Sequence, residues 1–157
     1  MKTNFIIFFI AASSLFSASS LAISQPDKEK LQIFINESKP YVVGMGRSAV
    51  ESCQDMANDM VKRYGYDLSK IGRQPSEIRD SSFEICINAL SSAQSAQSQD
   101  EIEMWKASAL ENIHQEFKND TREVTPKYFL TESVNHSEKI ARLAFFMMEL
   151  SKKYDMK

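Results

Sequence analysis

The chain has 157 residues, of which 43% are hydrophobic and 25% are charged, with 19 Lys and Arg against 21 Asp and Glu. A chain of this length forms one domain of ordinary size around one hydrophobic core. Because the two signs of charge are nearly balanced and mixed along the sequence, nucleic acid and anionic membranes are poor partners.

The first 22 residues have the features of a cleavable secretory signal. Lys2 precedes an apolar run at 5–12, and small residues lead up to Ala22, which is the order of regions in an export signal. We therefore expect residues 1–22 to be removed, leaving a single domain at 23–157 in the periplasm or outside the cell. No later stretch of the sequence reaches the roughly 18 apolar residues of a membrane helix, so we expect no membrane-spanning segment after cleavage.

The chain contains two cysteines, Cys53 and Cys86. In an exported protein an even number of cysteines favours a disulfide over free thiols, because the compartment is oxidising. We therefore predict one bridge, which ties the second predicted helix to the third.

The spacing of apolar residues predicts an all-α fold. From residue 76 onward there is no glycine and one proline, Pro126, and so long a stretch without helix breakers is typical of helices. Short connections favour antiparallel neighbours, so we expect a single-domain bundle of four to five main helices. The expected helices cover residues 27–39, 47–64, 82–96, 98–118 and 135 onward, with a short turn at 125–130.

Capping residues set several of these boundaries. Gly65 follows the second predicted helix, at the place of a left-handed C-cap residue. Ser81 with Glu84 makes a capping box for the third helix, and Ser98 with Glu101 makes one for the fourth.

The last predicted helix opens at Asn135 and is apolar on almost every side between residues 143 and 150. Such a helix is either surrounded by other helices or covered on its outer face by a partner. Phe145 is accordingly either a core residue or a contact residue for a homodimer or a target protein. We favour the central position.

Three patterns resemble cofactor or metal sites, and each has a simpler interpretation. Residues 44–49 fit G-x-G-x-x-A, but the βαβ unit that dinucleotide binding needs is missing. Glu111 and His114 form one Glu-x-x-His pair, whereas a di-metal bundle needs two. Met56 and Met60 lie one turn apart and are expected in the core rather than on copper. We therefore expect no metal and no cofactor.

The segment 64–75 is our candidate contact surface. It contains Tyr64, Tyr66, Arg73 and Gln74, and it is expected to form a loop between two helices. Tyrosine and arginine are enriched among the residues that dominate binding energy at protein interfaces, and loops often carry binding residues. The simpler alternative is an ordinary connector.

The leading hypothesis is a small exported helical protein that binds and inhibits a protein partner. Its most concrete version is an immunity protein that neutralises a toxin or a cell-wall hydrolase. This hypothesis rests on class analogy alone, because disulfide-linked helical domains without an evident catalytic group most often act by presenting a surface. The alternatives are a periplasmic stress chaperone or envelope accessory factor, and, third, an unrecognised hydrolase whose carboxylates converge from different helices.

Overall fold

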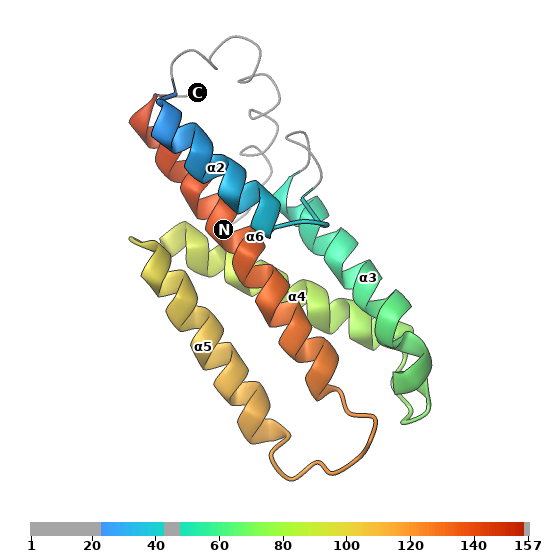
Figure 1. The fold of residues 1–157 in the computed structure, drawn as a ribbon. Coiled ribbons are helices and arrows are strands. Elements are labelled where there is room, and N and C mark those ends of the chain that lie inside the picture. The colour runs from blue at the N-terminus through green and yellow to red at the C-terminus, as the bar shows by residue number, and fades with distance from the viewer. Residues whose placement is uncertain (1–22, 43–47, 156–157) are drawn as a thin grey trace, which may run out of the picture.

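The computed structural model describes residues 23–42 and 48–155, which form five helices and no strand. The helices are α2 (Gln25–Glu37), α3 (Ala49–Ser69), α4 (Pro75–Ser95), α5 (Gln99–Glu116) and α6 (Lys127–Lys153) (Figure 1). The all-α helical bundle is therefore confirmed. The expected signal segment and most of the glycine pattern at 44–49 lie outside the described residues. Within the described ranges, no helix combines the length and the apolar character that crossing a bilayer requires.

Helix α6 is the centre of the bundle, and all four other described helices pack against it. It runs antiparallel to α5 through one connection, and α2 lies along its C-terminal half (Figure 1). This position explains why its middle is apolar nearly all round. Phe145 is 5% exposed and packs with Ala89 and Ile102, so the central position that we favoured from the sequence is the one observed.

Small side chains let α6 approach α3 and α4 closely. Ser133, Ser137 and Ala141 follow one another at intervals of four residues, on one face of α6, and all three are buried. Ser133 shares a hydrogen bond of 2.9 Å with Ser82 of α4, and its hydroxyl also lies 2.7 Å from the Phe129 carbonyl oxygen. The buried serine hydroxyls therefore have partners.

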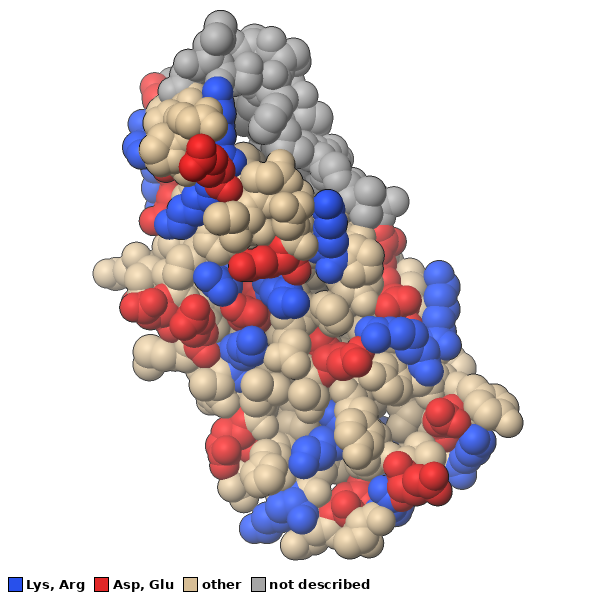
Figure 2. Space-filling view, in the orientation of Figure 1, with Lys and Arg blue, Asp and Glu red and all other residues tan. Residues whose placement is uncertain are grey.

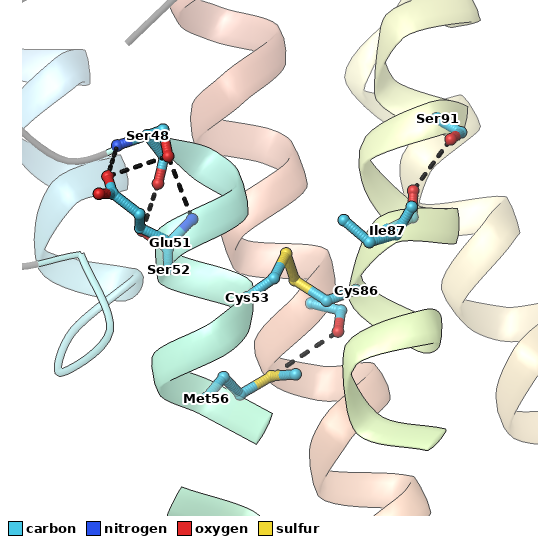
Figure 3. The surroundings of a disulfide bond; sticks show 9 residues. Ser48, Glu51, Ser52, Cys53, Met56, Cys86, Ile87 and Ser91 are labelled. Carbon is cyan, nitrogen blue, oxygen red and sulfur yellow. Dashed lines mark hydrogen bonds between the residues drawn. A yellow bond between two sulfur atoms is a disulfide. The ribbon is translucent and has the colours of Figure 1, made fainter. Parts of the chain in front are cut away.

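The predicted disulfide between Cys53 and Cys86 is present and links α3 to α4. Both residues are fully buried, with Cα atoms 5.6 Å apart. Figure 3 shows the bond bridging the two helices, with Met56 one turn further along α3. Met56 and Met60 are also fully buried, which agrees with their predicted place in the core.

The end of α3 differs from the prediction. The helix continues through Gly65 to Ser69, because Leu68 extends its buried face by a further turn. Gly72, with a φ of 82°, provides the left-handed residue instead. The amide of Arg73 donates to the Leu68 carbonyl oxygen, and that of Gly72 to the Ser69 carbonyl oxygen, which is the Schellman pattern.

The starts of two later helices also differ from the predicted boundaries. Helix α4 begins at Pro75, where the amide of Gln74 donates to the Glu77 carboxylate at 2.7 Å. The predicted capping box at Ser81 and Glu84 therefore lies inside the helix. Helix α6 likewise has no separate turn at 125–130 and runs continuously through Asn135.

A hydrogen-bonded latch joins the first and last described helices. The amide of Ser24 donates to the Tyr154 hydroxyl at 2.9 Å, and this hydroxyl donates to Asp27 at 2.6 Å. Lys153 lies 2.7 Å from the same carboxylate oxygen. The hydrogen bond from Lys153, and to a smaller extent the one from Tyr154, lowers the pKa of Asp27 to about 2. The latch places an acid at a helix N-terminus and a base at a helix C-terminus, where the helix dipoles favour them.

Candidate functional site

A network that links distant parts of the chain is centred on Arg63, where α3 faces α6. Its Nε lies 3.0 Å from Oδ2 of Asp59, one turn earlier on α3. Its Nη2 lies 2.6 Å from Oε2 of Glu132 on α6. The guanidinium is therefore fixed from both sides while the Arg63 side chain stays 40% exposed.

Tyr41 connects the segment after α2 to this network. Its hydroxyl donates to Asp59 Oδ2 at 2.7 Å, and Arg63 Nη2 approaches the same hydroxyl at 3.4 Å. The Tyr41 residue is 5% exposed. Burial, and to a smaller extent the hydrogen bond to the Asp59 carboxylate, raises the pKa of Tyr41 far above its usual value. The hydroxyl therefore remains a donor at all physiological pH values.

Two further aromatic groups border the network. Tyr64 packs on Phe129, with 6.4 Å between ring centroids, and burial followed by Glu132 raises its pKa to about 12. His136 meets the Tyr41 ring edge-on, with 4.9 Å between centroids. Burial is the main cause that lowers the pKa of His136, and the positive charges of Lys139 and Arg63 lower it further. The neutral imidazole is therefore favoured at pH 7.

Exposed tyrosines continue this surface beyond the ion pairs. Tyr66 is 78% exposed and lies on α3 three residues after Arg63. Tyr128 is 61% exposed and lies on α6 four residues before Glu132. Residues three or four apart share a helix face. We call the group formed by Arg63, Tyr66, Tyr128 and Glu132 the Arg63 surface.

The structure does not bring the predicted contact residues together in one loop. Tyr64 and Tyr66 lie within α3, because that helix extends to Ser69. Arg73 and Gln74 are exposed in the connection to α4, which is shorter than predicted. Of these four residues, Tyr66 belongs to the Arg63 surface and Tyr64 lies beneath it.

Sequence reasoning missed Arg63, Glu132 and Tyr41. The spacing of four residues between Asp59 and Arg63 on one helix was the available signal. The other partners come from distant parts of the chain, and no local pattern joins them.

The described residues contain no group of three or more histidine, cysteine or acidic residues placed to hold a metal ion. Glu111 and His114 are exposed on α5, and Glu111 accepts a hydrogen bond from Gln115 at 2.7 Å.

Comparison with known proteins adds no relative. No protein-family model, no curated protein and no solved structure matches the chain.

Proposed function

We propose that this chain is an exported protein that binds and inhibits a protein partner, in the manner of an immunity protein against a toxin or a cell-wall hydrolase. The signal-like N-terminal sequence and the buried disulfide support export. The Arg63 surface supports protein binding.

The observation that carries the proposal is the fixed and half-exposed guanidinium of Arg63. Two carboxylates hold it at 3.0 and 2.6 Å, so it loses little conformational freedom when a partner binds. Side chains that must be ordered on binding cost about 0.5 to 1.5 kcal/mol each. Arginine and tyrosine are also the residue types that contribute most to binding energy at protein interfaces.

The chemistry that the Arg63 surface offers is suited to recognition. Its guanidinium retains donors for an acceptor on the partner, and Tyr66 and Tyr128 offer large exposed rings that carry polar hydroxyls. Figure 2 shows acidic and basic side chains interspersed over one face of the molecule, without a large patch of one sign. Partner selection is thus expected to depend on local pairing rather than on bulk charge.

The test is capture of partners by the tagged mature chain, residues 23–157, from envelope extracts, followed by mass spectrometry. We expect one or a few saturable partners. Arg63→Ala and Tyr66→Ala should each weaken their binding by about tenfold or more, which corresponds to about 1.4 kcal/mol. Met104→Ala is the matched control, because Met104 is 70% exposed on α5, away from the Arg63 surface.

Other outcomes would contradict the proposal. Equal binding by the Arg63 variant and the control would exclude this surface. Capture of many unfolded proteins without preference would instead indicate the chaperone alternative, and turnover of a cell-wall substrate by the purified chain would indicate the hydrolase. Circular dichroism of every variant separates lost binding from lost folding.

A further inference from the structure

A charged groove of about 460 Å³ lies over the middle of α6 and is also lined by the end of α2 and by α5. This volume lies in the range of about 300 to 1,000 Å³ that is usual for small-ligand sites. Three acids and three bases line it: Glu37, Glu103, Lys106, Glu138, Lys139 and Arg142. The net charge of the lining is therefore zero.

Glu138 is the buried member of the groove, at 3% exposure. Its Oε1 lies 3.3 Å from Arg142 Nη1, and its Oε2 lies 3.3 Å from Lys106 Nζ. Charge-assisted contacts of this kind are usually about 2.7 to 2.9 Å long. Because each carboxylate oxygen has two lone pairs, Glu138 retains capacity for a further donor. A buried charge is costly unless it is well compensated, so a donor that approaches Glu138 more closely than Lys106 does is favoured.

The two basic partners of Glu138 differ in how firmly they are held. The Arg142 guanidinium lies 5.2 Å from the centroid of the Phe34 ring, and its Nε donates to Gln99 Oε1 at 3.3 Å. The Gln99 amide in turn donates to the Arg142 carbonyl oxygen at 3.2 Å. Lys106 is a point charge on a flexible stem with 32% side-chain exposure. Arg142 is therefore the fixed cation, and Lys106 is the replaceable one.

The balance of charge determines which ligand fits. A ligand of one sign would meet repulsion from half of the lining and would leave a net charge in the groove. A ligand that carries both an ammonium and a carboxylate can exchange partners with the existing ion pairs, and the groove stays neutral.

We infer that this groove binds a small zwitterionic ligand, namely an amino acid or a short peptide with free ends. The ligand ammonium contacts Glu138 in place of Lys106, and the ligand carboxylate contacts Lys106 and Lys139. The groove lies on α2 and α5 as well as α6 and shares no residue with the Arg63 surface, so the inference does not depend on the proposed function.

The experiment titrates the mature protein with L-alanyl-L-alanine and follows amide shifts by NMR. We expect saturable shifts at residues 99–106 and 138–142. N-acetyl-alanyl-alanine and alanyl-alanine amide each lack one charge, and each should bind about tenfold more weakly or worse, which is a difference of about 1.4 kcal/mol.

Two variants test the assignment of residues. Glu138→Gln removes the buried charge and should abolish binding. Because this change can also disturb the fold, Lys139→Gln on the rim is the second variant. It should weaken binding several-fold, while the matched control Lys118→Gln, an exposed lysine just after α5, should leave binding unchanged.

The inference is overturned if the unblocked peptide gives no saturable shifts at millimolar concentration. Equal affinity for the blocked peptides, shifts centred on other residues, or equal effects of the Lys139 and Lys118 variants would each overturn it as well. If the Glu138 variant is unfolded, the comparison of the two lysine variants decides the result.

Discussion

Removing the disulfide should destabilise the protein by an amount that follows from its position in the chain. Cys53 and Cys86 are 33 residues apart, and closing a loop of this length in the unfolded chain is worth about 3 to 4 kcal/mol in the chain-entropy description. The variant is Cys53→Ala with Cys86→Ala, so that no buried free thiol remains. Because a domain is stable by about 5 to 15 kcal/mol, we expect a folded but weakened protein.

The assay is urea unfolding followed by far-UV circular dichroism, with and without reductant. In oxidising buffer the double variant should lose about 3 to 4 kcal/mol relative to the native chain, and its melting temperature should fall by roughly 10 °C or more. Reductant should weaken the native chain to a similar extent and leave the double variant unchanged. A loss below about 1 kcal/mol, or an equal response of both proteins to reductant, would refute the reasoning.

Three further predictions test the fold. Gly72→Ala should lower the free energy of unfolding by about 1 to 2 kcal/mol, because φ at this residue is 82°. Gly65→Ala should raise it by about 0.5 to 1 kcal/mol, because Gly65 lies inside a helix and an added Cβ would make only ordinary van der Waals contact. Urea unfolding of both variants tests these opposite signs. The pKa of His136 is lowered in the fold, so the unfolded chain takes up its proton first as pH falls, and stability should decrease below about pH 6.5. Thermal melts between pH 7.5 and 5.5 should show this decrease in the native chain and a smaller one in His136→Gln; identical slopes would contradict it. Phe145→Asp should unfold the protein, because losing the aromatic side chain alone costs about 3 to 5 kcal/mol and the new carboxylate is buried. The control Ile33→Asp, at a site 55% exposed, should stay folded by circular dichroism and gel filtration. A folded Phe145 variant would place that residue at the surface.

The helices and the disulfide could be predicted from the sequence because they depend on local spacing and on the chemistry of the compartment. Helix ends were less predictable because several residues offered the same local signal. Gly65 and Gly72 both follow apolar turns, and only the tertiary burial of Leu68 decides between them. In the same way, α4 starts earlier than the capping box that the sequence favoured, because Ile78 is buried in the core and belongs to the helix.

The candidate site could not be predicted for a different reason. Asp59 and Arg63 have the spacing of an ordinary surface pair on a helix, which is typical of a solvated face. Their partners Tyr41 and Glu132 come from separate elements, and the contact depends on how α6 lies across α3. Glu138 shows the same limitation, because nothing in its sequence neighbourhood indicates that it is buried.

The latch between Ser24, Asp27 and Tyr154 brings the first and last described residues close together. Because Ser24 and Tyr154 meet there, a short linker from residue 155 to residue 23 should allow circular permutation, with new ends in the connection between α5 and α6. Fusions joined at residue 23 or at residue 155 would share this location. Glu132 lies 21 residues before Lys153 on α6, or about 30 Å along the helix axis. An affinity tag or fluorophore placed at the latch therefore leaves the Arg63 surface accessible.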